Sequence, residues 1–503
     1  GGGGEAFGAG LAVFDGAYAE ADCKDAALLG KVTSIEGGVE VVVDAFLNTN
    51  EPFCFAAVGV QGAGKSHTLA CVLEGCLLPC PNVVRLHAPM AALVLHYDQS
   101  PVAVCEAMGL LHPAPMIERI LGATSAQALC LPRERVTVLV SPSFYRQRKR
   151  FYGDACTVRP LLLRWGGLSA DHIKRIMRVR DGDNQLYVAA LLDLLRRYQR
   201  QGVWPRFTDF VEEVKAVCNA KGQEGPLQQR LALLGAMVDE SDENAEIVAE
   251  GMGVVGACAP GHLVVVDLTV PLLSSEEANG VFQVLVEQFR STPTGGGKLL
   301  VLDEAHKYMS GDSSDGLSEA IVDTARLMRH DGMRLALSTQ NPMALAPELL
   351  ELTTVAMLHR FHSRDWFNHL AKKLGIDQAL WPAILKLDPG RAVMFASRHA
   401  LFEGDETRRT FPISIRARIT ADRGASRKNV APKSSSEAPS LGASTPDTVD
   451  LTARDALVGQ HDLAPKLSMG EAPSLLQENA SAAEAEALGQ EDTPTLAPHN
   501  VGL

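Results

Sequence analysis

A glycine-rich stretch at residues 59–66 has the residue types and the spacing that could hold phosphate groups. Gly59 is followed by four residues and then by Gly64, Lys65 and Ser66, which is the spacing of a P-loop or Walker A motif. Glycines let successive backbone N–H groups converge on phosphate oxygens, because no Cβ stands in the way. Lys65 would reach the β and γ phosphates of ATP, and the Ser66 hydroxyl would ligate Mg²⁺. The residues predicted to bind the nucleotide are Gly59, Gly62, Ala63, Gly64, Lys65, Ser66 and His67.

A pattern of this kind can also arise by chance in a chain that has 44 glycines among 503 residues. The flanking residues argue against chance, since Phe53–Val58 is a short apolar run and the residues after Ser66 have the spacing of an amphipathic helix. A P-loop requires this order of strand, loop and helix. The helix predicted to begin near Lys65 also directs its positive end at the same anion.

A pair of acidic residues follows a second apolar run and could complete the site, as a Walker B motif does. Lys298–Leu302 reads KLLVL, and Asp303 and Glu304 come directly after it. A P-loop ATPase needs a carboxylate at the end of a buried strand to hold the metal. Asp303 is therefore predicted to hold Mg²⁺ through water, and Glu304 to polarise the water that attacks the γ-phosphate. The alternative is a surface Asp–Glu pair at the start of a helix.

Two more polar side chains are candidates for catalysis. Gln340 follows the predicted strand Arg334–Ser338 and could contact the γ-phosphate or its water, although alone it would be an ordinary loop residue. Arg326 and Arg329 lie on the helical stretch that leads into this strand. Arg329 is predicted to act as an arginine finger on the ATP of a neighbouring subunit, and the alternative is a surface ion pair.

The elements that must position these residues are short buried strands that alternate with helices. Apolar runs of this kind indicate an α/β fold whose mostly parallel sheet is flanked by helices on both faces. Besides Phe53–Val58, the predicted strands are Val39–Val43, Ala91–His96, Arg135–Val140, Leu263–Val266, Lys298–Leu302, Arg334–Ser338, Thr353–Leu358 and Arg391–Phe395.

The pattern changes along the chain and predicts five segments. Residues 161–251 contain helix-length stretches without strand-like runs, which indicates an inserted helical subdomain. The last residues are rich in Ala, Ser, Pro, Glu and Asp and contain no aromatic residue, which is typical of disorder. The predicted segments are a lead-in with a short strand at 1–50, the first part of an ATPase core at 51–160, the insertion at 161–251, the second part of the core with the Walker B and sensor residues at 252–422, and a disordered acidic tail at 423–503.

Composition limits the class of protein. With 46% hydrophobic and 21% charged residues, the chain has the composition of a soluble globular protein. It has no apolar run long enough to span a membrane and no secretory leader, so it is predicted to be intracellular, in the cytoplasm or nucleus, without a membrane partner. The ten cysteines include no Cys-x2-Cys pair, and free buried thiols are predicted rather than disulfides or a metal site.

One basic segment is a candidate for binding DNA. The net charge of −13 argues weakly against a surface coated for DNA, so local patches matter more than the total. Tyr145–Tyr152 reads YRQRKRFY and interleaves basic residues with aromatic ones. A solvated loop or a partner to an acidic surface is the alternative. The residues that could contact phosphates or stack on bases are Arg146, Arg148, Lys149, Arg150, Tyr145 and Phe151.

Four motifs together resemble those of one family. VGVQGAGKSHT, LLVLDEAHKYM, ARLMRHDG and ALSTQNPMAL are similar to motifs of the HerA/FtsK class of RecA-like ATPases, over roughly Phe53–Ile419 apart from the insertion. The segment IKRIMRVRDGDNQLYVAALLDLLRRYQR also looks like a helical segment of fungal proteins. The resemblance implies a RecA-like P-loop fold, ATP hydrolysis with Mg²⁺, and a ring-shaped homo-oligomer, typically a hexamer. Such rings move double-stranded DNA as translocases or helicase-like motors. The resemblance also implies an acidic residue near the nucleotide at Asp98, which could equally be a strand-end turn residue.

Three kinds of function remain open. The first is an ATP-driven motor on double-stranded DNA. The second is an ATP-dependent switch or protein-remodelling ATPase, in which the helical insertion and the acidic tail bind a protein partner. The third is a nucleotide-binding scaffold that no longer hydrolyses ATP, and the intact Lys65, Asp303 and Glu304 argue against it.

Overall fold

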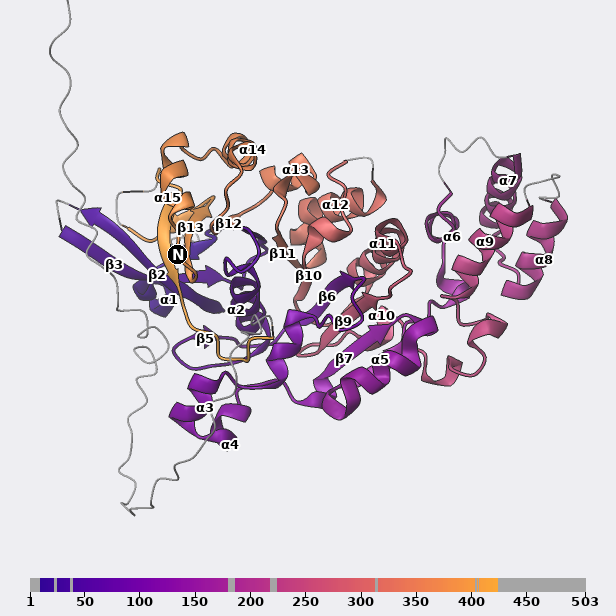
Figure 1. The fold of residues 1–503 in the computed structure, drawn as a ribbon, viewed down its shortest axis with the longest axis horizontal. Coiled ribbons are helices and arrows are strands. Elements are labelled where there is room, and N and C mark those ends of the chain that lie inside the picture. Colours follow the sequence, from indigo (N-terminus) through magenta and orange to yellow (C-terminus); the bar gives the residue numbers. More distant parts are fainter. Residues whose placement is uncertain are drawn as a thin grey trace, which may run out of the picture. The chain divides into compact units, whose positions relative to one another are not determined.

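The computed structural model describes residues 10–21, 25–36, 39–179, 186–217, 224–312, 315–402, 405 and 407–423. The predicted tail at 423–503 lies outside the described residues from residue 424 on. Within the described part of the chain, one large sheet packs against helices on both faces (Figure 1).

Eight strands of this sheet run parallel to one another, in an order that differs from their order in the sequence. The P-loop strand β4 (Cys54–Val58) lies between β12 (Val355–Leu358) and β11 (Met333–Thr339). Because the strands are parallel, their carboxyl ends meet at one edge, where open α/β sheets bind ligands. Beyond β11 the sheet continues through β10 (Lys298–Leu302), β6 (Ala91–Asp98), β9 (Leu263–Thr269), β7 (Val136–Val140) and β8 (Thr157–Pro160).

A mainly antiparallel extension continues the sheet on the other side of β12. Gly30 is required where β2 (Ala26–Glu36) lies beside β15 (Thr410–Ile415), because a Cβ at this position would stand 2.0 Å from the carbonyl oxygen of Ser414. The sequence predicted only β3 and β13 of this extension and missed the others. Its strands are, in spatial order, β13 (Arg391–Ala396), β15 (Thr410–Ile415), β2 (Ala26–Glu36), β3 (Val39–Asn48), β1 (Val13–Phe14) and β14 (His399–Ala400), with β5 (Val84–Arg85) paired to β2.

The predicted α/β class with a mostly parallel sheet is confirmed, and every apolar run that predicted a strand forms one. The strand β10 has the predicted bounds. The strands β6 and β9 run further than predicted, to Asp98 and Thr269, so the polar residues near their ends still belong to the sheet.

Alternate residues of each strand point to opposite faces of the sheet and pack against different helices. Phe55 of β4 belongs to a core with residues of α2 (Lys65–Leu77) and α5 (Tyr145–Tyr152). Its neighbour Ala56 belongs to a core with residues of α11 (Ser275–Ser291), α12 (Gly316–Asp331) and α14 (Arg364–Leu374). The described helices are α1 (Gly16–Ala21), α2 (Lys65–Leu77), α3 (Pro115–Leu121), α4 (Ala123–Gln127), α5 (Tyr145–Tyr152), α6 (Ala170–Ile176), α7 (Leu186–Gln201), α8 (Phe207–Val217), α9 (Glu224–Gly235), α10 (Val254–Ala257), α11 (Ser275–Ser291), α12 (Gly316–Asp331), α13 (Pro347–Glu351), α14 (Arg364–Leu374) and α15 (Trp381–Leu385). None of them is long and apolar enough to cross a membrane.

The helices α6 to α9 occupy the region where the sequence predicts a helical insertion. Trp165 lies at the centre of their aromatic packing, with ring centroids 5.0 Å from Phe210 and 5.2 Å from Phe207. The Nε2 atom of His172 on α6 lies 2.8 Å from a carboxylate oxygen of Glu287 on α11. The apolar side chains of the insertion therefore continue the core on one face of the sheet, and His172 adds a polar contact with α11, a helix that covers this face.

Candidate active site

The glycines of the P-loop occupy positions where a side chain would be strained or would collide. Gly62 and Gly64 have φ values of 74° and 108°, in the left-handed region that favours glycine. A Cβ on Gly59 would stand 2.7 Å from the Cβ of His359, which is buried beneath the loop. The loop thus keeps its backbone N–H groups close together, and α2 begins directly after it at Lys65.

The Lys65 side chain is buried and lies between the loop and the Walker B residues. Its Nζ atom donates to the carbonyl oxygen of Val60 at 3.1 Å and lies 3.7 Å from Oε1 of Glu304. Burial lowers the pKa of Lys65, although the negative charges of Glu304 and Asp303 act in the opposite direction. The ammonium group therefore has few fixed partners and can exchange a loop carbonyl for a phosphate oxygen.

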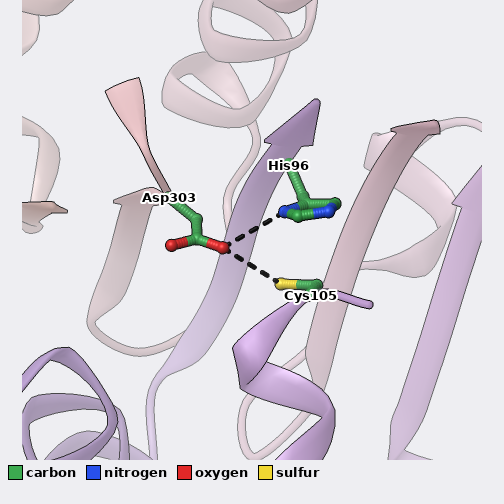
Figure 2. Close-up of side chains that lie close together, drawn as sticks. All are labelled: His96, Cys105 and Asp303. Carbon is green, nitrogen blue, oxygen red and sulfur yellow. Dashed lines mark hydrogen bonds and ion pairs between the residues drawn. The ribbon is translucent and has the colours of Figure 1, made fainter. Parts of the chain in front are cut away.

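Polar residues form a row across the carboxyl ends of four neighbouring strands. The register of β9, β6, β10 and β11 places Asp267 beside His96, His96 beside Asp303, and Asp303 beside Ser338. His96 Nδ1 lies 3.1 Å from Oδ2 of Asp303, and the Ser338 hydroxyl donates to Oδ1 at 3.2 Å (Figure 2). Both carboxylate oxygens of Asp303 are thus oriented by neighbouring strands.

The environment of Asp303 suits a metal ligand. Burial alone would raise the pKa of Asp303, but hydrogen bonds from His96 and Ser338 and the charge of Lys307 lower it below its ordinary value. The carboxylate therefore stays ionised although it is buried. Ser66 and Asp303 line one small cavity of about 10 Å³, the space of a single water-sized group. Their hydroxyl and carboxylate oxygens are the donors that Mg²⁺ prefers, so the residues present fit this ion.

Glu304 lies between Lys65 and Gln340, in an unusual backbone conformation. Its φ of 49° is one of three positive values among the described residues other than glycine. Its N–H donates to the Ser338 hydroxyl at 2.9 Å, which holds this conformation. Its Oε2 accepts a hydrogen bond from Gln340 Nε2 at 2.7 Å and lies 3.5 Å from His306 Nδ1. The structure therefore brings together three predicted residues whose side chains come from three separate segments.

Two predicted residues have side chains away from this cluster. His67 Nε2 lies 2.8 Å from the carbonyl oxygen of Arg416, so only the backbone of His67 remains free for a nucleotide. The prediction that His67 belongs to the nucleotide site stays a prediction, for its backbone N–H group. Arg329 is exposed on α12. Its guanidinium group lies near Gly10, with Nη2 4.0 Å from the position that a Cβ on Gly10 would occupy. The role of Arg329 toward a neighbouring subunit stays a prediction.

Two residues with alternative interpretations have ordinary local partners. Asp98 Oδ2 accepts from Lys307 Nζ at 2.6 Å, and its Oδ1 accepts from the N–H of Ser100 at 2.8 Å. Asp98 is thus a strand-end residue in a tight turn. Arg326 pairs with Glu348 at 2.5 Å on the surface, as the ion-pair alternative predicts.

The basic segment Tyr145–Tyr152 forms the helix α5, and two of its six predicted DNA contacts are wrong because the side chains are buried. The contacts predicted for the exposed residues Arg146, Lys149, Arg150 and Phe151 stay predictions. Arg148 is 2% exposed and forms an ion pair with the buried Asp267. Tyr145 is also buried and hydrogen-bonded to Glu250. The remaining basic residues lie on the outside: Arg146 pairs with Glu246, Lys149 pairs with Glu250, and Arg150 is exposed.

Sequence reasoning missed several residues that support the site. His96 and Ser338 orient Asp303, and His359 lies under the loop with its Nε2 3.0 Å from the Thr68 hydroxyl. A signal existed for the first two, because each is a polar residue at the end of an apolar run and neighbouring parallel strands end together. The sequence held no comparable signal for Cys105, whose Sγ lies 3.9 Å from Oδ2 of Asp303.

No protein-family model and no curated protein matches the chain. Among solved structures, it is similar to VirB4 of Thermoanaerobacter pseudethanolicus, with 16% identity over 78% of this chain and 96% of VirB4, at a TM-score of 0.41. It is similar to the bacterial conjugative coupling protein TrwB, with 13% identity over 78% of this chain and 90% of TrwB, at a TM-score of 0.44. A third is the genome-packaging NTPase B204 of Sulfolobus turreted icosahedral virus 2, with 18% identity over 28% of this chain and 63% of B204, at a TM-score of 0.22.

At such low identities and TM-scores, the likenesses assign no function to the chain. The chemistry of the site has to come from its own residues.

Proposed function

We propose that this chain binds and hydrolyses ATP as a P-loop motor of the HerA/FtsK type. The observation that carries the proposal is the convergence of Lys65, Glu304 and Gln340 beside a P-loop, with Asp303 one residue from Glu304. Lys65, Glu304 and Gln340 belong to three different motifs, and the parallel sheet brings these motifs to one edge. An accidental glycine pattern would not have these partners.

The chain's own residues have distinct roles in the proposed reaction. Backbone N–H groups of the P-loop and Lys65 bind the phosphates, with Lys65 leaving the Val60 carbonyl for a phosphate oxygen. Glu304 takes the proton of the attacking water as that water bonds to the γ-phosphorus and the bond to the leaving oxygen breaks. The side-chain amide of Gln340 already donates a hydrogen bond to Glu304, and the same amide orients the attacking water.

Magnesium is the metal whose preferences the oxygen donors of this site match. Ser66 and Asp303 would hold it, and the ion would neutralise charge on the β and γ phosphates when bound. His96 and Ser338 keep the Asp303 carboxylate oriented toward that position.

The decisive experiment is steady-state ATP hydrolysis by the wild-type chain and by Glu304→Gln. Loss of a general base lowers turnover by about 10²- to 10⁴-fold, whereas ATP binding should persist because Lys65 and the loop are intact. Glu319→Gln, which removes an exposed glutamate on α12, is the matched control and should hydrolyse ATP normally. Equal turnover in Glu304→Gln and the wild type would remove the assigned base.

The finer part of the proposal is a ring that translocates double-stranded DNA. It rests on the motif resemblance, and it requires Arg329 to reach the ATP of a neighbouring subunit. Arg329→Ala should then lower turnover by about 10³-fold or more, whereas Arg326→Ala, on the same helix, should leave it unchanged. Equal effects of the two substitutions would reject the arginine finger.

A protein-directed switch is the second candidate, and the structure of α5 favours it. Arg148 is buried, and Arg146 and Lys149 face acidic side chains, so this helix offers less free positive charge than its sequence indicates. Hydrolysis with and without linear duplex DNA, at low and near-physiological salt, separates the two candidates. Several-fold stimulation that falls as salt rises supports the motor. If duplex DNA does not stimulate hydrolysis at either salt concentration, the motor is rejected. The protein-directed switch then remains, with a protein partner bound at the helical insertion.

A further inference from the structure

Three different metal-ligating side chains meet at the Walker B aspartate. The atoms that His96, Cys105 and Asp303 can offer to a metal lie within 4.8 Å of one another, and all three residues are buried (Figure 2). Oδ2 of Asp303 is the shared centre, 3.1 Å from His96 Nδ1 and 3.9 Å from Cys105 Sγ. Imidazole, thiol and carboxylate therefore face one point from three separate segments of the chain.

These separations are close to those that a tetrahedral zinc site needs. Zinc binds nitrogen and oxygen at about 2.0–2.1 Å and sulfur at about 2.3 Å, which puts neighbouring ligand atoms about 3.3–3.5 Å apart. The separations of 3.1 Å and 3.9 Å from Asp303 lie on either side of this range, and all ligand atoms lie within 4.8 Å of one another, so side-chain movements without a change of backbone would suffice. A nitrogen and a sulfur donor suit zinc-like cations and do not suit Mg²⁺, which prefers oxygen.

The cavity beside these residues has room for one ion. It measures about 10 Å³, and its lining includes Ser66, Cys105 and Asp303. The cavity therefore joins the proposed oxygen ligands of Mg²⁺ to the thiol of Cys105. A cation in it would have Asp303 as a ligand in either case.

His96 directs one ring nitrogen at the cluster and the other away from it. Its side chain is buried, and Nε2 has no hydrogen-bond partner among the described residues. Nδ1 is the nitrogen that faces Asp303, so it is the atom that would ligate a cation at this point. Nε2 lies across the ring and is not one of the proposed ligand atoms.

We propose that His96, Cys105 and Asp303 form a binding site for a soft divalent cation of the zinc class. On binding, the Cys105 thiol releases its proton to solvent and ligates as thiolate, with no change of oxidation state. Because the site uses Asp303, this cation and Mg²⁺ exclude each other, and ATP hydrolysis stops when the soft cation is bound. This last consequence rests on the proposed function, whereas the binding itself does not.

Cadmium titration of the nucleotide-free full-length chain tests the binding directly, through the ultraviolet charge-transfer band of a cadmium–thiolate bond. Cys105→Ser should bind Cd²⁺ at least about tenfold more weakly than the wild type, and unlabelled Zn²⁺ should displace the wild-type band. Cys76→Ser is the matched control, since Cys76 is equally buried on α2 but belongs to no such cluster in the described part of the chain. Equal bands in the wild type and Cys105→Ser would overturn the site.

A second variant keeps the test decisive if Cys105→Ser fails to fold. His96→Gln retains a polar group beside Asp303 but removes the imidazole, and it should also lose about tenfold or more in Cd²⁺ affinity. Unchanged affinity in a folded His96→Gln would overturn the proposal in the same way.

Inhibition of hydrolysis tests the competition with magnesium. Hydrolysis is measured at fixed Mg²⁺ and ATP with increasing Zn²⁺, and each variant is compared with its own zinc-free rate. The Zn²⁺ concentration that halves the rate should be at least about tenfold higher for Cys105→Ser than for the wild type or Cys76→Ser. Identical zinc sensitivity in all three would reject the competition. If the wild type did not hydrolyse ATP at all, the proposed function would fail, while the cadmium titration would still decide the metal site.

Discussion

The P-loop helix α2 carries a charged pair near each of its ends, and the two pairs differ in how completely their atoms are bonded. At the start, Lys65 lies 3.7 Å from Glu304 and has one other close partner, the Val60 carbonyl. Toward the end, Glu74 lies 2.7 Å from Arg416, and neither side chain is exposed. Burial would raise the pKa of Glu74, but the charge of Arg416 and hydrogen bonds from Thr420 lower it.

The difference indicates which pair serves structure and which serves chemistry. Arg416 also donates to the carbonyl oxygens of Leu28 and Cys71, and Glu74 accepts from both the N–H and the hydroxyl of Thr420. Such a saturated network cannot admit a ligand without breaking. The loose pair at Lys65 can exchange a partner at little cost, which is what binding a phosphate requires.

Breaking the saturated pair should have the largest effect on stability. Glu74→Gln leaves the Arg416 guanidinium buried without its counter-charge, and removing one partner of a buried pair costs about 3–5 kcal/mol of unfolding free energy. Urea denaturation followed by circular dichroism measures it. A loss near zero would show that the two ends of α2 do not differ in the way proposed.

Removing the loose partner should affect binding more than stability. Lys65→Ala loses charge-assisted hydrogen bonds to phosphate worth about 1.5–3 kcal/mol, or roughly a 10- to 150-fold weaker ATP affinity, with an unfolding free energy within about 1 kcal/mol of the wild type. Equilibrium binding of a fluorescent ATP analogue, together with the same urea denaturation, gives both numbers. A larger loss in stability than in binding would reverse the comparison.

A smaller, pH-dependent effect should come from His359, which supports the loop end of α2. Burial, and then the nearby charge of Lys65, lowers the pKa of His359 to about 3. In the unfolded chain the imidazole of His359 takes up a proton near pH 6.5, whereas in the folded chain it stays neutral. The free energy of unfolding is therefore highest above that pH and falls by about 1.4 kcal/mol per pH unit below it. At pH 5 this amounts to about 2 kcal/mol. His359→Gln should flatten the pH dependence of unfolding between pH 7 and 5; an unchanged slope would mean that His359 titrates normally in the folded chain.

Local patterns were sufficient to predict the central sheet and the first residues of the site. The strand β10 and the residues Asp303 and Glu304 follow from one short stretch of sequence, in which an apolar run is followed by two carboxylates. The strand β15 was missed because it alternates buried and exposed residues and contains Pro412. The strand β2 was missed although it begins with the apolar run Ala26–Leu29, which Gly30 and Lys31 interrupt.

Long-range pairing determines where two of the predicted side chains lie. The sequence of α5 indicated a solvated or DNA-binding surface, but Arg148 is buried against Asp267. These two residues are 119 positions apart, so the local sequence does not reveal the pair. The side chain of His67 turns toward Arg416, which is 349 residues away. Each of these contacts depends on the order of strands in the sheet, which single-sequence patterns do not specify.

The stretch from Arg416 to Arg423 also has a mechanical consequence. Arg416 holds it to Glu74 on α2, and Arg418 holds it to Glu106 just beyond β6. Tension applied to the chain after Arg423 would load the Arg418–Glu106 pair first and would then reach α2 through the Arg416–Glu74 pair. The end of the described chain is thus a tether to the helix that begins at the P-loop.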